Sequence, residues 1–321
     1  MGNESNVMCG YLNDNQRFAD LFNGGFFKGQ PVIRAEELRE ASEVYTGKIE
    51  GSSDSYLRVR DIKKVVGHKM VLRVLAVESQ THVDYTMPWR CFNYDSLEYG
   101  VQIKQIRKSN LKKGTFDTGA ERLCGFKKSD RLIPVYTICL YHGEELWDGP
   151  RCLKDMMELD GKGIWENWFA DYPMNLICIN EQTDFTCYQT PLREVFSLLR
   201  YRRDKRGLKK LLEEDPAYQE MDEETSQVVS VLMGAEKFME ERERYRKEEK
   251  YNMCQALQEM MEDSRQEGRE EGRKEGRKEG IRALVETCKD FGISKEESVS
   301  RVAQKFSIPD YKAEGYVKAY W

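Results

Sequence analysis

Apolar residues near the start of the chain recur at helical spacing. Within residues 14–22, phenylalanine and leucine follow one another at i, i+3 and i+4, which is the spacing of one face of a helix. Asn13 or Asp14 can cap the start of this helix, and the glycines after Asn23 can end it. A second, polar helix is expected over residues 35–41.

Four later segments have the composition of β-strands. Residues 56–62 are rich in β-branched and aromatic side chains with partial alternation, and residues 70–78 form a nearly continuous apolar run. The second of these suits a strand that is buried on both faces and lies at the centre of a sheet. Residues 134–141 and 174–179 are two further buried runs, the first of which stops at His142.

Helical patterns separate and follow these strands. Residues 89–106 carry Phe92, Leu97 and Val101 at helical spacing, which predicts a helix with an apolar face. Residues 192–212 have the pattern of another helix with a basic face. Because strands and helices alternate along the chain, the sequence predicts an α/β protein whose sheet is covered by helices.

The character of the sequence changes at about Asp215. Strand patterns vanish, and residues 267–280 repeat the motif EGRE-EGRK-EGRK-EG. Each glycine of the repeat costs a helix about 1 kcal/mol relative to alanine, whereas each ion pair returns only about 0.2–0.5 kcal/mol. Two interpretations stay open, a helical linker and a self-association element. The apolar tail that follows is expected to form two or three small helices.

These patterns predict three regions. Residues 11–215 form the α/β domain, residues 216–282 form a charged helical linker, and residues 283–321 form a small helical module at the C-terminus.

Composition narrows the class of protein. The 321 residues are 33% charged with a net charge of −5, so a wholly basic nucleic-acid coat is excluded but a local basic site is not. There is no apolar run long enough to cross a membrane, and the N-terminal segment lacks the features of a signal peptide. The nine scattered cysteines are expected to be reduced thiols in a cytoplasmic protein.

The candidate chemistry lies where two predicted strands end. Asp61 lies at the end of the first strand and Glu78 at the end of the second, with Gln80 two residues later. A carboxylate at the end of a buried strand needs a partner, and Mg²⁺, or Mn²⁺ in its place, prefers such oxygen ligands. Asp61, Glu78 and the backbone carbonyl of Ser79 could hold the ion, and Gln80 could orient a water or a phosphate. The alternative is that Asp61 lies in a turn and Glu78 in an ion pair.

Ordered blocks of residues 11–215 resemble a known family. The blocks are DNQRFADLFNGGFFKGQPVI, RDIKK, LRVLAVESQTHVDYTMPWRCFNYDSLEY, ERLCGFKKSDRLIPVYTICLYHGEELWDGP and LREVFSLLRYRRDKRGLKKLL. Their order and intervals resemble the Rpn/YhgA-like family of transposases and recombination-promoting nucleases in the PD-(D/E)XK superfamily. The glycine-punctuated repeat also looks like those of bacterial members.

The resemblance implies a fold and a set of site residues. The fold is a restriction-endonuclease-like core, with a mixed central sheet flanked by helices, followed by an all-α extension. Asp61 looks like the first metal acid, Glu78 like the second, and Gln80 like the glutamine that replaces the superfamily lysine. Asp14 resembles an acid on the first helix near the site, with Asp20 as a competitor. The chain departs from the superfamily pattern at Arg60, where a proline is expected, and Gln80 supplies no positive charge.

Further residues are accessory candidates. His82 could reach the mouth of the site, and Arg90 could contact a phosphate, although structural roles are plainer for both. Two basic segments could contact DNA phosphates, or could be solvated surfaces. Their candidate residues are Lys104, Arg107, Lys108, Lys112 and Lys113 in the first segment and Arg202 and Arg203 in the second.

Two functional hypotheses follow. The first is a Mg²⁺-dependent, transposase-like DNA endonuclease that hydrolyses phosphodiester bonds, with double-stranded DNA as its partner and RNA as a weaker option. The second is a catalytically impaired protein that keeps the nuclease fold and binds nucleic acid or protein. The absence of a cation at Gln80 motivates the second hypothesis.

Overall fold

The computed structural model describes residues 3–40, 61–67, 70–77, 83–159, 163 and 167–321. The chain divides into two compact units, residues 1–256 and residues 257–321. None of the helices in these ranges combines the length and the apolarity needed to cross a bilayer.

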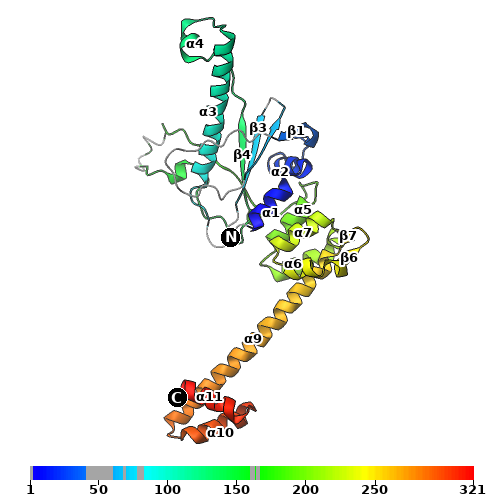
Figure 1. The fold of residues 1–321 in the computed structure, drawn as a ribbon, viewed down its shortest axis with the longest axis vertical. Helices are drawn as coiled ribbons and strands as arrows, with labels where there is room; N and C mark the ends of the chain where they lie inside the picture. Colours follow the sequence, from blue (N-terminus) through cyan, green and yellow to red (C-terminus); the bar gives the residue numbers. More distant parts are fainter. Residues whose placement is uncertain (1–2, 41–60, 68–69, 78–82, 160–162, 164–166) are drawn as a thin grey trace. The chain divides into compact units, whose positions relative to one another are not determined.

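A five-stranded mixed sheet forms the centre of the first unit (Figure 1). Its strands, in spatial order, are β1 (Leu38–Glu40), β2 (Asp61–Val66), β3 (Met70–Val77), β4 (Val135–Tyr141) and β5 (Asn175–Cys178). The pairs β1–β2 and β2–β3 are antiparallel, whereas β3–β4 and β4–β5 are parallel. The α/β class and the central position of the long apolar run are therefore confirmed.

The α-helices of the first unit flank this sheet or lie beyond it. They are α1 (Asn3–Leu12), α2 (Asn15–Phe27), α3 (Met87–Lys113), α4 (Gly119–Cys124), α5 (Leu192–Arg200), α6 (Lys205–Glu214), α7 (Glu223–Leu232) and α8 (Glu236–Glu240). Short 3₁₀ segments are η1 (Ala35–Glu37), η3 (Lys154–Met156), η4 (Ile179–Glu181), η5 (Pro216–Gln219) and η6 (Arg242–Tyr245). In Figure 1, α3 lies on one side of the strands and α1 and α2 lie on the other.

Two neighbouring lysines of β2 fasten helices to opposite faces of the sheet. Successive side chains of a strand point to opposite faces. The ammonium of Lys63 lies 2.6 Å from the carboxylate of Glu98 on α3. The ammonium of Lys64 donates to the carbonyl of Asn13 and to the side chain of Asn15, both at 2.7 Å, between α1 and α2. The sheet is thus clamped between the helices through polar as well as apolar contacts.

The face that α3 turns to the sheet differs from the predicted one. Phe92 and Leu97 are 41% and 43% exposed, so the apolar face predicted for this helix is wrong. The buried stripe is largely polar and consists of Cys91, Asp95, Glu98 and Gln102. The reason is that the sheet itself presents polar groups on this face, the ammonium of Lys63 and the hydroxyl of Thr137, which require polar partners.

The glycines of α2 do not end that helix. The helix continues to Phe27 and is capped by Lys28 in the left-handed conformation. A Cβ at Gly24 would lie 2.4 Å from the ring of Tyr188, and one at Gly25 would lie 2.5 Å from Ile177. Both glycines are therefore needed for close packing inside the helix rather than for a stop.

Three other boundaries also differ from the predictions. Residues 35–41 were expected to be a helix, but only η1 is helical and Leu38 begins β1. The helix expected over residues 192–212 is broken after Arg200, where Asp204 caps the second piece, α6. The region expected to be all-α contains a small hairpin, β6 (Arg246–Lys247) and β7 (Lys250–Tyr251), whose turn places Glu248 at positive φ.

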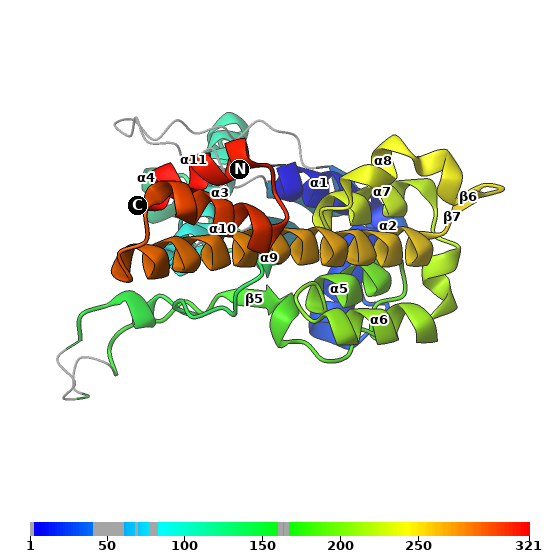
Figure 2. The same ribbon diagram turned by 90° about the horizontal axis from the view of Figure 1, so that it is seen from below.

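The second unit is a helical hairpin on the end of a long helix. Its helices are the C-terminal part of α9 (Met253–Asp290), α10 (Lys295–Phe306) and α11 (Asp310–Tyr320), which lie side by side in Figures 1 and 2. Their core consists of Ile281, Val285, Val302, Ala303, Ala313 and Val317. The expected small helices of the tail are present, and self-association through this region stays a prediction.

The exposed glycines of the charged repeat generate a stability prediction. A Cβ at Gly268, Gly272 or Gly276 would meet no atom within 4 Å, so alanine fits at all three. Because glycine costs a helix about 1 kcal/mol relative to alanine, the triple Gly→Ala variant should stabilise this part of α9 by about 2–3 kcal/mol. Slower amide hydrogen exchange over residues 262–280 of the full chain measures this effect.

The control for this prediction is Gly280→Ala. A Cβ at Gly280 would lie 3.2 Å from the ring of Phe306, so this substitution should slow exchange less than any of the other three. Unchanged exchange in the triple variant would show that α9 does not open locally at the repeat.

Candidate functional site

Asp61, the one predicted metal ligand among the described residues, lies at one end of the sheet. Asp61 is the first residue of β2 and pairs with Leu75 of β3, which ends two residues later at Val77. Val77 in turn pairs with Tyr141, the last residue of β4. The start of β2 and the ends of β3 and β4 therefore share one end of the sheet.

The prediction that Asp61 ends its strand is wrong, and the correction matters. The described part of this strand runs from Asp61 to Val66, antiparallel to β3. If Asp61 had ended an antiparallel strand, it would lie at the opposite end of the sheet from the end of β3. The other predicted residues of the site, Glu78, Ser79, Gln80 and His82, lie outside the described residues.

Asp14 has a structural role in the first helix layer. Its carboxylate accepts hydrogen bonds from the backbone N–H groups of Gln16 and Arg17 and so caps α2. The residues on either side of Asp14 bind Lys64, which lies three residues along β2 from Asp61, or about 10 Å in an extended strand. Asp14 therefore has a capping role in α2, and its part in the proposed site stays a prediction.

Asp20, the competitor of Asp14, is buried and also structural. It accepts hydrogen bonds from the backbone N–H groups of Gln189 and Thr190, at 2.8–3.0 Å, and from the Thr190 hydroxyl at 2.6 Å. These bonds anchor the loop that leads into α5 to the middle of α2. Its carboxylate therefore holds this loop in place.

Arg90 is paired with an acid that lies just before α3. Its guanidinium lies 2.5 Å from the carboxylate of Asp84, whose pKa is lowered by hydrogen bonds from Thr86 and from Arg90 that outweigh the effect of burial. The same Asp84 oxygen that binds the Thr86 backbone N–H also accepts from its hydroxyl, at the start of α3. Arg90 thus stabilises the entry into α3.

Sequence reasoning missed a buried carboxylate on α3. Asp95 accepts hydrogen bonds from the hydroxyl of Thr137 on β4 and from that of Tyr172, both at 2.5 Å. Burial and the neighbouring carboxylate raise the pKa of Tyr172, which therefore stays protonated and donates. The available signal was the spacing of Asp95, Glu98 and Gln102, which places polar residues on one helical stripe.

His142 follows β4 at the same end of the sheet and is almost fully buried. Neither ring nitrogen has a hydrogen-bond partner in the described part of the chain. Burial, with a smaller contribution from the nearby charge of Arg202, lowers the pKa of His142 to about 3. The imidazole is therefore neutral at physiological pH.

The two basic segments differ in how their charges are used. Arg202 is 12% exposed, donates to the carbonyls of His142 and Leu232, and pairs with Glu4 at 3.3 Å. Arg203 pairs with Glu144 and Glu145 at 2.7 and 2.5 Å. The candidates on α3 are instead exposed, and none forms an ion pair within the described ranges. The α3 segment is thus the one with charges available to an anion.

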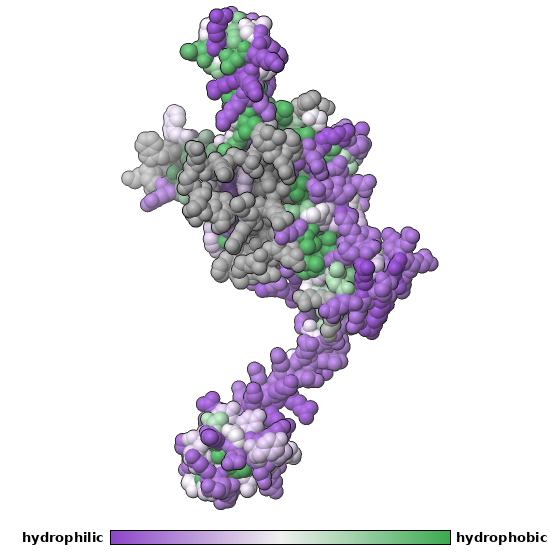
Figure 3. Space-filling model, in the orientation of Figure 1, coloured by the Kyte–Doolittle hydropathy of each residue, from purple (hydrophilic) through white to green (hydrophobic). Residues whose placement is uncertain are grey.

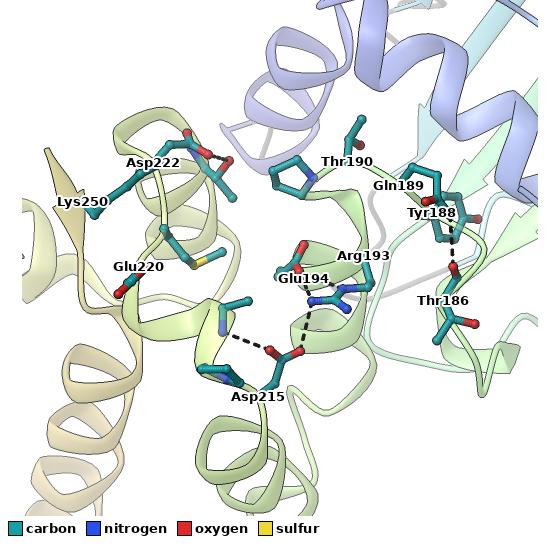
Figure 4. A pocket seen from close by; sticks show the side chains of 15 residues that line it. Thr186, Tyr188, Gln189, Thr190, Arg193, Glu194, Asp215, Glu220, Asp222 and Lys250 are labelled. Carbon is teal, nitrogen blue, oxygen red and sulfur yellow. Dashed lines mark hydrogen bonds and ion pairs between the residues drawn. The ribbon is translucent and has the colours of Figure 1, made fainter. Parts of the chain in front are cut away.

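A cavity of about 760 Å³ lies between the start of α5 and the residues that lead into α7 (Figure 4). Its charged groups serve the surrounding structure. Arg193 binds Glu194 and Asp215, Asp215 also accepts from the backbone of η5, and Asp222 caps α7 through Thr225. These contacts join the segments that surround the cavity.

Comparisons with protein-family models, with curated proteins and with solved structures return no match for this chain. Among the described residues, no group of three or more histidine, cysteine, aspartate or glutamate side chains could hold a metal ion. The family assignment therefore stays a prediction from sequence.

The state of His142 predicts a pH dependence of stability. An unfolded histidine has a pKa near 6.5, so as the pH falls below this value the unfolded chain binds a proton that the folded chain does not. This one group should lower the free energy of unfolding by about 2 kcal/mol between pH 7 and pH 5. Urea unfolding at several pH values measures the change.

The matched variant is His142→Gln, which has no titrating ring. Its absolute stability can differ, but its loss of stability between pH 7 and pH 5 should be smaller than that of the wild-type chain by about the same 2 kcal/mol. Equal pH dependence in both chains would mean that His142 becomes protonated without unfolding.

Proposed function

We propose that the chain is a metal-dependent DNA endonuclease, transposase-like in kind, whose site lies where β2 begins and β3 ends. The observation that carries this proposal is the antiparallel register that pairs Asp61 with Leu75. Val77 is about 7 Å further along β3, and Glu78 is the next residue of the chain. This register supports a meeting of the two acids at one end of the sheet.

The proposed donor set suits Mg²⁺ or Mn²⁺. Asp61, Glu78 and the backbone carbonyl of Ser79 would hold the ion through hard oxygen atoms, which both ions prefer. When bound there, such an ion lowers the pKa of a water molecule and offsets the charge that develops on the phosphate. Gln80 would orient the attacking water or a phosphate oxygen by hydrogen bonds. The chain's nine cysteines are free thiols, in keeping with the proposed cytoplasmic location.

Polar contacts between α3 and the sheet support the scaffold around the proposed site. The Lys63–Glu98 ion pair joins α3 to β2, and the hydrogen bonds of Asp95 join α3 to Thr137 of β4 and to Tyr172. These contacts fix α3 against one face of the sheet. Phosphodiester hydrolysis depends on the positions of charges more than on covalent help from the protein. A scaffold fixed by several buried polar contacts fits that requirement.

A catalytically impaired binding protein is the second candidate. Gln80 supplies no positive charge where the superfamily pattern has a lysine, which would slow hydrolysis or abolish it. The exposed cations of α3 would still bind nucleic acid in such a protein, because they do not depend on the metal site.

Nicking of supercoiled plasmid DNA in Mg²⁺ tests the proposed function. The wild-type chain should nick the plasmid, and Asp61→Asn should lower the rate on the order of a hundredfold or more, because it replaces a charged metal ligand with a neutral side chain. Asp290→Asn, the same change on an exposed residue of the second unit, should nick at the wild-type rate.

Two results would contradict the proposal. Full nicking by Asp61→Asn would refute the assigned site. A wild-type chain that binds the plasmid without nicking it in Mg²⁺ or Mn²⁺ would support the binding protein instead.

A further inference from the structure

The outer part of α3 and the chain that returns from it form an arm. This arm consists of residues 103–133, which include the second half of α3, all of α4 and the segment that leads back to β4. In Figure 1 the arm extends beyond the sheet, with α4 at its tip. It is the part of the first unit that carries the unpaired cations of α3.

Buried polar contacts stiffen the arm. At its base, Gln102 exchanges two hydrogen bonds with the backbone of Ile133, at 2.7 and 3.0 Å. Nearer the tip, the buried amide of Asn110 donates to the carbonyl of Gly125 at 3.2 Å and to the carboxylate of Asp130 at 2.7 Å. Gly125 itself is at positive φ and ends α4. The returning segment is thus fastened to α3 at two levels.

Two of the three acids in the arm accept hydrogen bonds from backbone N–H groups. Glu121 accepts hydrogen bonds from the N–H groups of Asp117 and Lys128, both at 2.9 Å. Asp130 accepts from the N–H of Lys127 at 2.7 Å as well as from Asn110. These N–H groups lower the pKa of both carboxyls, so both stay ionised while bound to the backbone rather than to the neighbouring cations.

The cations of the arm are therefore left unpaired. The arm has nine cations against three acids, a net charge of +6 in a chain whose total is −5. No described residue forms an ion pair with any of the nine, in contrast to Arg203 and its two glutamates. The nine are Lys104, Arg107, Lys108, Lys112, Lys113, Arg122, Lys127, Lys128 and Arg131.

We propose that this arm is the surface that binds the phosphates of duplex DNA, an inference that rests on the proposed function for the identity of its ligand. Lys104, Lys108 and Lys112 repeat at i, i+4 and i+8, so they form one stripe about 12 Å long on α3. A duplex presents phosphates at short, regular intervals along each strand, and a stiff row of cations matches such a rod.

A membrane surface suits the arm less well. An interfacial helix needs a continuous apolar face opposite its cations. The large apolar residues most exposed on the arm are Leu111 and Leu123, at 62% and 92%; Lys112 follows the first and Arg122 precedes the second. Figure 3 shows hydrophilic and apolar side chains next to one another at the end of the arm. The charge of the arm is therefore the feature that selects its ligand.

The test is binding of a fluorescently labelled duplex by the full chain, measured by anisotropy in EDTA at several salt concentrations. The variant Lys104→Gln/Lys108→Gln/Lys112→Gln should bind at least about tenfold more weakly than wild type. Its salt slope, the slope of log affinity against log salt concentration, should be smaller in magnitude by about three. The matched control is Lys205→Gln/Lys209→Gln/Lys210→Gln on α6, an equal loss of exposed charge in the second basic segment. The control should match the wild-type affinity and slope.

Two results would overturn the arm as a DNA surface. One is wild-type affinity and salt slope in the α3 triple variant. The other is arm-dependent binding to vesicles that contain phosphatidylserine, with no binding to the duplex.

EDTA separates this inference from the nuclease proposal, because binding is measured without cleavage. Arm-dependent binding in a chain that never nicks DNA supports the arm and refutes the nuclease. Nicking by a chain whose binding does not depend on the arm supports the nuclease and refutes the arm.

Discussion

The hydrogen-bond ladder between β2 and β3 runs antiparallel, so the start of one strand and the end of the next reach the same end of the sheet. Asp61 pairs with Leu75 in this ladder, and β3 has only two residues left before it ends. A shift of the register by one residue would turn every side chain of β2 to the other face. The proposed chemistry depends on this one pairing, because the two acids are seventeen positions apart in the sequence.

Buried charges keep that register in place. Lys63 and Lys64 are adjacent in β2, and their ammonium groups are bound on opposite faces, by Glu98 on one side and by Asn13 and Asn15 on the other. A shift of one residue would place one lysine in the position of the other and leave the remaining ammonium without its partner, and breaking a buried pair costs about 3–5 kcal/mol. These contacts therefore specify one arrangement of strands and helices, even if their net contribution to stability is small.

Local patterns predicted the elements of the sheet well. The apolar run that begins at Met70 became the central strand, and the run that ends at Tyr141 became its parallel neighbour. Length and continuous apolarity identify such strands because both faces are buried. The first helix was also located correctly, but its end was not, since Gly24 is needed for contact with Tyr188, a partner far away in the sequence.

The features that sequence reasoning missed depend on contacts across the fold. The face of α3 could not be chosen from apolarity, because its partners on the sheet, Lys63 and Thr137, are themselves polar. The position of β2 along the chain was also not predicted, because an acid at the boundary of a strand can stand at its beginning or at its end. For the candidate site, the sequence located Asp61 at a strand boundary, but it did not distinguish the paired Arg202 from the unpaired Lys108. That distinction depends on which acids the fold brings near each cation.

Binding of Mn²⁺ to the full chain, followed by electron paramagnetic resonance, tests the central claim most directly, because it needs neither DNA nor turnover. Asp61→Asn and Glu78→Gln should each weaken binding at least about tenfold, since each removes one charged ligand of the same ion. Asp14→Asn, which alters only the cap of α2, should leave the affinity unchanged. Wild-type affinity in both of the first two variants would contradict a shared metal site at this end of the sheet.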